Sequence, residues 1–366
     1  MKRYILLQGL LIQSLLISAS EFEILENILP SEIDESFSVG LSHSRFDNSL
    51  DILNYSNKLN STKPKKATTD NAFISYSFKK FKLGYEYSDS SGTVVRKSQP
   101  LTLETNVEND SLYVTYDFLQ NDSNSYELSV FVKEEEQDPV TIDCYAFGDT
   151  VVGGACEEAS IRSLNSEIYK STGELIYEPV LKTSGNSDSE GIILRIRSKS
   201  LGLFKFNHSL SYKTSEVYQN FQSVILNTTD TFTRNITIDG QNAGELLDRF
   251  KNELPQETPW KENAFKYTIS NLIPFGNNFA FSGMYSFIKV NRKHYLSNPN
   301  KEDFTKNHLI DLTLFYGLSD YGTIYLKVSA STNYLLGVNP LAYNRRSSHL
   351  FDHPYGQLNA GVIFKF

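Results

Sequence analysis

Residues 355–366 read YGQLNAGVIFKF, and apolar and polar side chains alternate along them. One parity of the segment holds Leu358, Ala360, Val362, Phe364 and Phe366. The other parity holds Gln357, Asn359, Gly361 and Lys365. Because successive side chains of a strand point to opposite faces, this pattern predicts a β-strand with one apolar face and one polar face.

The same segment carries a more specific spacing. It places a polar residue, a glycine and two aromatic residues at Asn359, Gly361, Phe364 and Phe366. This arrangement resembles the C-terminal signal of bacterial outer-membrane β-barrels. The resemblance implies that the barrel-assembly machinery recognises these four residues and that the chain crosses the outer membrane with strands. A soluble protein can also end in a buried strand, so the rest of the chain must supply an export signal and more alternating strands.

The N-terminus has the pattern of an export signal. Lys2 and Arg3 precede an apolar run over residues 4–17, and small residues follow at 18–20. We therefore predict a signal peptide over residues 1–20 that directs the chain through the Sec pathway to the outer membrane. A retained anchor is the alternative, but the run is short for a spanning helix. Residues 21–35 are predicted to form a short periplasmic leader, and a small plug inside a barrel is the alternative.

Composition also favours a barrel. The chain has 366 residues with 22 Tyr and 24 Phe, yet its mean hydropathy is only -0.34. A helical membrane protein would be far more apolar, whereas a barrel exposes only alternate residues to lipid. The net charge of -8 argues against a nucleic-acid partner, since neutralising phosphates requires a basic surface.

Alternating segments come in pairs that are joined by tight turns and separated by longer polar loops. Short turns in the periplasm and long loops outside are typical of outer-membrane barrels. We predict an all-β fold over residues 36–366, a single transmembrane antiparallel up-and-down barrel of about 14 strands. This count includes a weakly patterned hairpin in residues 160–184, and 12 or 16 strands are the other counts considered. The first strand, at Phe37, is expected to pair with the last, so that no edge faces lipid.

Two loops have features of their own. Cys144 and Cys156 lie in one loop and are predicted to form a disulfide, because the exported chain meets an oxidising compartment. The longest loop, residues 214–262, contains apolar residues at helical spacing in 244–254. This helix either folds into the pore as a constriction or lid, or packs on the surface.

If the apolar parity faces lipid, the polar parity lines the interior of the barrel. The predicted basic pore-lining residues are Arg195, Arg197, Lys205, Lys213 and Lys266. The predicted acidic ones are Glu86, Asp117, Glu127 and Asp311. Neighbouring strands place the bases on one wall and the acids mostly across from it, which gives a field that orients polar solutes. Alternatively these charges pair with each other and fill a closed interior.

No arrangement of residues indicates catalysis. His208 and Ser209 are adjacent on a predicted strand, so their side chains point to opposite faces and cannot share a proton. The two thiols have no nearby His with which to form a zinc site. The chain is therefore expected not to be an enzyme and to need no metal or cofactor.

The sequence favours a porin-like channel for passive diffusion of small polar or anionic solutes. The expected partners are outer-membrane lipid, the assembly machinery and a small solute, and association of copies is left open. One alternative is a non-conducting barrel for surface-protein export or adhesion. Another is a transporter of hydrophobic substrates: the strand count resembles that of the long-chain fatty-acid transporter family, but only about fifteen residues precede the first strand, too few for that family's N-terminal plug.

Overall fold

The computed structural model describes fifteen stretches of the chain, and all structural statements below concern them. They are residues 35–47, 62–96, 102–121, 123–142, 145–147, 150–152, 181–198, 205–223, 237–238, 241–242, 259–276, 278–296, 303–319, 321–343 and 354–366.

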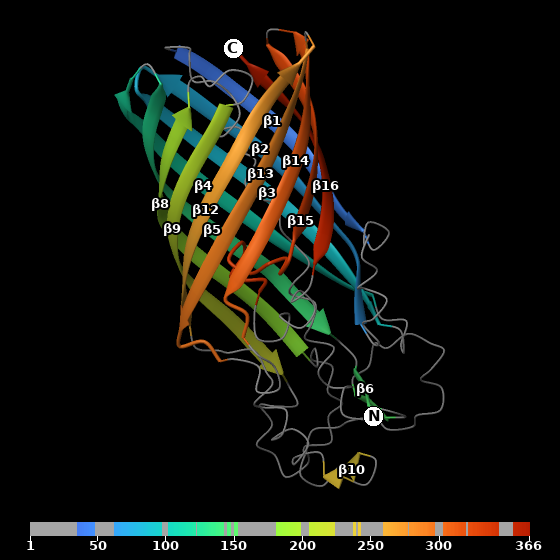
Figure 1. The fold of residues 1–366 in the computed structure, drawn as a ribbon. Helices are drawn as coiled ribbons and strands as arrows, with labels where there is room; N and C mark the ends of the chain where they lie inside the picture. The colour runs from blue at the N-terminus through green and yellow to red at the C-terminus, as the bar shows by residue number, and fades with distance from the viewer. Residues whose placement is uncertain are drawn as a thin grey trace.

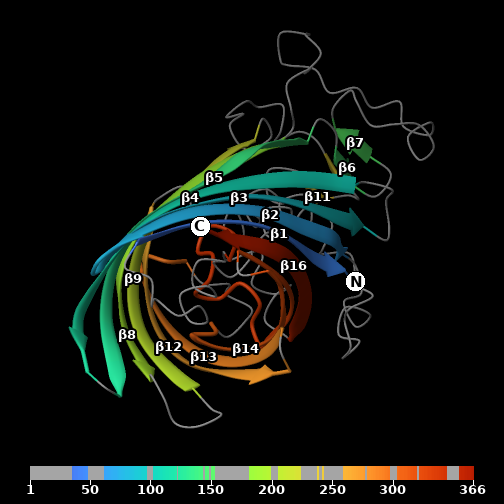
Figure 2. The ribbon, with the colours of Figure 1, turned by 90° about the horizontal axis from the view of Figure 1, so that it is seen from above.

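The described residues form a closed antiparallel barrel of twelve strands (Figures 1 and 2). The strands are β1 (Glu35–Asp47), β2 (Thr62–Phe78), β3 (Phe81–Arg96), β4 (Thr102–Gln120), β5 (Asn124–Ile142), β8 (Leu181–Ser198), β9 (Lys205–Ser223), β12 (Trp260–Phe275), β13 (Phe279–Lys293), β14 (Lys306–Ser319), β15 (Gly322–Ser331) and β16 (Tyr355–Lys365). Each strand pairs with the barrel strands before and after it in the sequence, and β1 pairs with β16. Two small hairpins, β6 (Tyr145–Phe147) with β7 (Thr150–Val152) and β10 (Thr237–Ile238) with β11 (Gln241–Asn242), lie apart from the barrel sheet.

The predicted count of about fourteen strands exceeds the observed twelve by two. The difference is the hairpin expected in residues 160–184. β5 pairs directly with β8 over residues 124–142 and 181–198, so the residues between them add no strand to the ring. Twelve was one of the other counts considered. Apolar and polar residues alternate only weakly over residues 160–180, which argues against a pair of barrel strands there.

The two ends of the barrel have different connections. At one end, called the turn end, the connections are short and span residues 79–80, 121–123, 199–204, 276–278 and 320–321. At the other, called the loop end, they reach as far as residues 143–180 and 224–259. β1 starts and β16 finishes at the turn end (Figure 1). The predicted asymmetry of turns and loops is therefore present in the fold.

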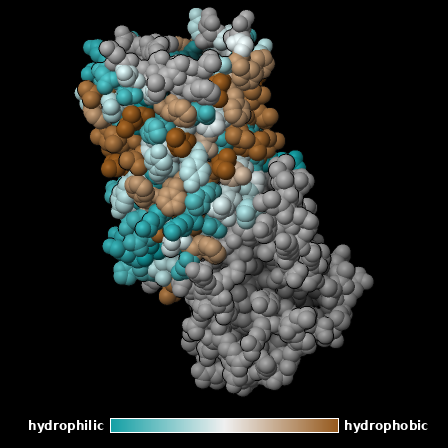
Figure 3. Space-filling view, viewed as in Figure 1, coloured by the Kyte–Doolittle hydropathy of each residue, from teal (hydrophilic) through white to brown (hydrophobic). Residues whose placement is uncertain are grey.

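An apolar band surrounds the turn half of the outer surface. On β4 and β5 it consists of Leu112, Val114, Leu128, Val130 and Val132, whose side chains are all exposed. The brown area of Figure 3 shows this band on one face, with hydrophilic residues beyond it. Apolar side chains this exposed and contiguous indicate contact with lipid or a partner.

Towards the loop end the same outward parity becomes charged. One row across neighbouring strands holds Asp110, Glu134, Asp188, Glu216 and Lys261. Strand pairing continues through this charged row, because the backbone hydrogen bonds between strands form whether the outward side chains are polar or apolar. β9 therefore runs to Ser223, well into the loop predicted at 214–262, and β12 begins at Trp260.

The barrel closes between β1 and β16. The amide of Phe37 donates to the carbonyl oxygen of Phe366 at 2.9 Å, and the amide of Phe366 donates back at 2.8 Å. Along residues 355–366, Asn359 is buried inside the barrel, while Phe364 on β16 and Phe366 just after it are exposed outside, as the alternation predicts. At Gly361 an added Cβ would lie 2.4 Å from the hydroxyl oxygen of Tyr325, so a larger residue here would force the buried Tyr325 ring to move.

Several sequence predictions lie outside the described residues. They are the signal peptide over residues 1–20, nearly all of the leader over 21–35, the Cys144–Cys156 disulfide and the helix in 244–254. β1 begins at Glu35, the last residue assigned to the leader. The described residues contain no helix whose length and apolar character would let it cross a membrane.

Candidate functional site

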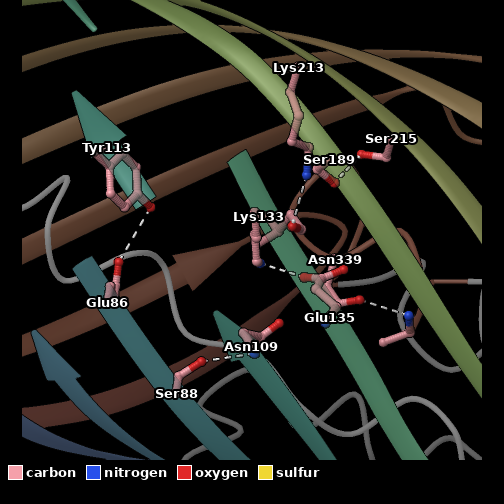
Figure 4. Close-up of polar contacts among 12 residues, drawn as sticks. Glu86, Ser88, Asn109, Tyr113, Lys133, Glu135, Ser189, Lys213, Ser215 and Asn339 are labelled. Atoms are coloured by element: carbon pink, nitrogen blue, oxygen red, sulfur yellow. Dashed lines mark hydrogen bonds and ion pairs between the residues drawn. The ribbon is translucent and has the colours of Figure 1, made fainter. Parts of the chain in front are cut away.

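The interior of the barrel is lined by many small polar side chains and, toward the turn end, by an apolar cluster of Phe73, Phe315, Tyr325 and Ile363. Buried inward-facing examples are Ser42, Asn71, Ser75, Thr115, Ser129, Ser209, Thr268, Ser270, Ser282, Ser286 and Thr313. Many of them bond across strands: Asn109 donates to Ser88 at 2.8 Å and Ser189 donates to Ser215 at 2.8 Å (Figure 4). Side chains of this kind satisfy one another at the wall and leave the middle of the barrel to other groups.

Residues 332–343, which follow β15, fold into the barrel and are called the lumen segment. Figure 2 shows this red coil inside the ring of strands. Leu335, Leu336, Leu341 and Ala342 are fully buried. One apolar cluster joins them to wall residues of β2, β4, β9, β12, β13 and β16, namely Ala67, Val107, Val217, Trp260, Ala264, Ile288, Val290 and Tyr355. Since β2 and β12 lie on opposite sides of the ring, the cluster crosses the lumen in its loop half.

Asn307 on β14 anchors the start of the lumen segment. Its side-chain amide donates to the carbonyl oxygen of Leu336 at 3.0 Å. Its side-chain oxygen accepts from the amide of Asn333 at 3.0 Å and from the hydroxyl of Thr332 at 3.2 Å. One buried side chain therefore satisfies three groups of the segment, which fixes the direction in which the chain leaves β15.

β9 holds the second half of the lumen segment. The side-chain amide of Gln219 donates to the carbonyl oxygen of Leu341 at 3.1 Å, and the ammonium of Lys213 donates to that of Val338 at 3.3 Å. The segment is thus attached to two walls, β14 and β9, by hydrogen bonds to its own backbone. Buried carbonyl groups without such partners would carry a desolvation cost.

The conformation of the lumen segment depends on a glycine. Gly337 has φ +74°, and an added Cβ would lie 2.5 Å from a methyl carbon of Ile288. Both the left-handed backbone and the close approach to β13 therefore require glycine. Nearby, Tyr334 donates to Gln357 at 3.4 Å, and burial raises the pKa of its phenol above 10.0, so it donates as a neutral group.

A buried ion pair supports the end of the lumen segment. Arg292 on β13 donates from Nε to Glu262 on β12 at 2.9 Å. Its guanidinium carbon lies 4.8 Å from the ring centroid of Tyr343 and 4.8 Å from that of Tyr295. Arg292 therefore connects the last residue of the segment to the barrel wall through cation–π contacts as well as charge.

The predicted basic residues lie on adjacent strands, as expected, but several have partners. Arg195 is fully buried and donates to Ser129 at 2.6 Å. Arg197 contacts both carboxylate oxygens of Glu127, at 2.8 and 3.0 Å. Lys213 binds the lumen segment, and Lys266 is half-buried with interactions of its own. Lys205 begins β9, and its side chain lies outside the described residues.

The predicted acidic residues are not all across from the bases. Glu127 lies on β5, directly beside the β8 that carries Arg197. Glu86 on β3 is buried and accepts from Tyr113 at 3.4 Å, as Figure 4 shows, and Asp117 on β4 is half-buried. Asp311 on β14 is buried apart from these three. Glu127 therefore contacts Arg197, whereas Asp311 lies on β14, away from the other predicted acids.

The lumen segment lies between the last two strands, where the alternating pattern predicts only a connecting loop. The available signal was the apolar run YLLGVNPLAY at 334–343. An external loop has no reason to carry so many apolar residues, and a segment that enters the barrel does.

No protein-family model matches this chain, and no curated protein sequence does. Similar solved structures include the translocator domain of the autotransporter NalP from Neisseria meningitidis, 7% identical, covering 91% of this chain and 89% of that one with a TM-score of 0.48. The KdgM porin in complex with oligogalacturonate is 9% identical, covering 90% and 99%, with a TM-score of 0.36. The COG4313 outer membrane channel from Pseudomonas putida F1 is 8% identical, covering 96% and 100%, with a TM-score of 0.38.

A closed antiparallel barrel with an outward apolar band, short turns at one end and long loops at the other is the architecture of bacterial outer-membrane β-barrels. The chain resembles that class in its fold as well as in its terminal signal.

Proposed function

We propose that the protein is an outer-membrane channel for passive passage of small polar solutes, in which the lumen segment forms the constriction. The observation that carries this proposal is the fold of residues 332–343 into a barrel whose wall is rich in serine, threonine and asparagine. A second apolar cluster of Phe73, Phe315, Tyr325 and Ile363 lies on the wall toward the turn end.

The outer surface supports insertion into a bilayer. The apolar band covers the turn half, and the β1–β16 pairing leaves no unpaired strand edge within it. Hydrocarbon cannot satisfy backbone amide and carbonyl groups, so a chain that crosses it with strands has to close them into a ring. The charged row at the loop end then lies outside the hydrocarbon.

The interior supports passage of polar solutes. Side chains fill the interior of an eight-stranded barrel, and the diameter grows with strand number. A twelve-stranded ring is therefore wider than one whose side chains fill it. Serine, threonine and asparagine line much of its wall, and Phe73, Phe315, Tyr325 and Ile363 form an apolar cluster toward the turn end. The lumen segment narrows the loop half. Water and small polar molecules are the contents that such a wall accommodates.

The predicted preference for anions depends on guanidinium and ammonium groups that face the solute. Arg197 is paired with Glu127, and Lys213 is bonded to the lumen segment. We therefore propose polar solutes as the substrate class and do not include a preference for anions.

The lumen segment can be tested by replacing residues 334–342 with a glycine–serine linker of the same length. In planar bilayers we expect higher single-channel conductance than for the unaltered protein, because the constriction is gone. Leu296→Ala, which alters an exposed apolar side chain, serves as the control. If neither the unaltered protein nor the linker variant conducts, the chain is a non-conducting barrel, as in the export or adhesion alternative.

A further inference from the structure

The buried carboxylate of Asp311 is the one inward-facing acid that the described residues leave uncompensated. Asp311 is 2% exposed, and neither of its carboxylate oxygens has a hydrogen-bond partner. Three other buried acids of the described wall have cations: Glu127 pairs with Arg197, Glu262 with Arg292 and Glu135 with Lys133. A fourth, Glu86, accepts a hydrogen bond from Tyr113. Taking an unpaired carboxylate out of water is costly, so this position calls for a positive or hydrogen-bond-donating partner.

Asp311 lies beside the constriction, on its turn-end side. Leu309, the preceding inward residue of β14, packs against the apolar cluster of the lumen segment. Leu309 is also paired in register with Ser331, after which the segment begins. Asp311 is one inward position closer to the turn end, and the apolar cluster with Phe315 lies further along β14 on that side. Its carboxylate therefore lies between two apolar clusters of the interior.

The neighbouring strands place a hydroxyl and a thioether opposite Asp311. Its register partners are Ser329 on β15 and Met284 on β13. The hydroxyl of Ser331 is buried and has no hydrogen-bond partner either. Lys327, the nearest inward cation along β15, is opposite Thr313 and has interactions of its own.

We propose that Asp311 binds the positive charge of a small cation in transit, so that the channel prefers cations to anions. This inference rests on the proposed channel function and assigns its substrate class. The ligand chemistry is one compact positive charge with hydrogen-bond donors or a coordination shell that serine hydroxyls complete. Alkali-metal ions and small organic ammonium ions share this chemistry, and the test separates them.

The first measurement is the reversal potential of the full-length protein in planar bilayers under a potassium chloride gradient. We expect cation preference for the unaltered protein and a fall of about threefold or more in the cation-to-anion permeability ratio for Asp311→Asn. Asp188→Asn, the same substitution on the exposed outer face, should leave the ratio unchanged. A ratio that is the same in all three proteins overturns the proposal and leaves the channel function standing.

The second measurement does not depend on conductance. The thermal unfolding midpoint of the detergent-solubilised protein is followed while potassium chloride or methylammonium chloride is added at constant ionic strength, with choline chloride as the balance. We expect stabilisation of the unaltered protein that Asp311→Asn lacks, and the more effective salt identifies the class of cation. Without added cation, Asp311→Asn should unfold at the same or a higher temperature, since it removes an uncompensated charge.

The two measurements separate the possible failures. A protein that does not conduct but loses its cation-dependent stabilisation in Asp311→Asn refutes the channel and keeps the cation site. If Asp311→Asn unfolds at a clearly lower temperature while Asp188→Asn does not, the carboxylate has a structural role and the cation proposal is wrong.

Discussion

At the scale of single residues, the inward charges matter through what lies beside them. Arg197 and Glu127 contact each other through two atom pairs, and the carboxylate side chain is only 4% exposed. Two charges this close and this buried act on a solute mainly as a dipole. The pair therefore stabilises the wall of the barrel and adds little to the long-range electric field inside it.

Arg197→Gln tests this view. We expect the variant to lose about 3–5 kcal/mol of stability, because Glu127 keeps a buried charge without its partner. The double variant Glu127→Gln with Arg197→Gln should recover most of that loss, since neither charge remains. Thermal unfolding in detergent measures both. Equal destabilisation of the single and double variants would show that the pair is not coupled.

At the scale of elements, the lumen segment depends on Asn307 more than on any other single anchor. Its side chain satisfies groups of three successive parts of the segment, Thr332, Asn333 and Leu336. The apolar cluster supplies most of the packing, but it has no directional bonds of its own. Loss of the anchor should therefore loosen the segment without unfolding the barrel.

Asn307→Ala is expected to increase fluctuations between conductance levels in single-channel recordings, while the barrel stays resistant to unfolding in detergent. Asn109→Ala is the matched control, because Asn109 is an inward asparagine whose side chain bonds to Ser88 on the wall. Current traces of Asn307→Ala that are as quiet as those of Asn109→Ala would contradict the assigned role of the anchor.

Alternation in the sequence was sufficient to predict the strands inside the apolar band and the closure of β16 on β1. It was not sufficient at the loop end, where the outer faces of β4, β5 and β8 are polar and apolar residues such as Val107 and Val217 are too sparse to give a periodic signal. The lumen segment was missed for a related reason. Its burial depends on contacts with Trp260, Ile288 and Val290, which are far away in the sequence. The pairing of Arg197 with Glu127 likewise requires the direct β5–β8 register, which the extra predicted hairpin had hidden.

At the scale of the whole molecule, the boundary between the apolar band and the charged row defines how deep the proposed outer-membrane barrel would lie in a bilayer. On β5 this boundary falls between Val132 and Glu134, which are both exposed on the outer face. The turn half is then surrounded by hydrocarbon, and the loop half extends into water or the headgroup region.

Val130→Arg and Glu134→Arg place the same side chain on one strand and one face, on either side of the boundary. Arginine facing hydrocarbon costs about 2–4 kcal/mol near the midplane and about 0–1 kcal/mol near the interface. We expect Val130→Arg to reduce the yield of folded barrel in lipid vesicles, measured by the gel mobility of unheated samples, and Glu134→Arg to leave it unchanged. Equal yields would place the membrane elsewhere on the barrel.

The pairing of β1 with β16, the seam of the barrel, also affects the order in which the strands assemble. It joins residues from opposite ends of the barrel sequence, and Phe37 and Phe366 bond to each other through both backbone groups. Contacts between residues so distant along a chain form slowly, because the entropy of closing the loop is lost before the contact rewards it. All the other strand pairs can form between sequence neighbours, but this one has to wait for them. The seam is therefore expected to be the last pairing to form during biogenesis, and until it does the sheet remains open along one side.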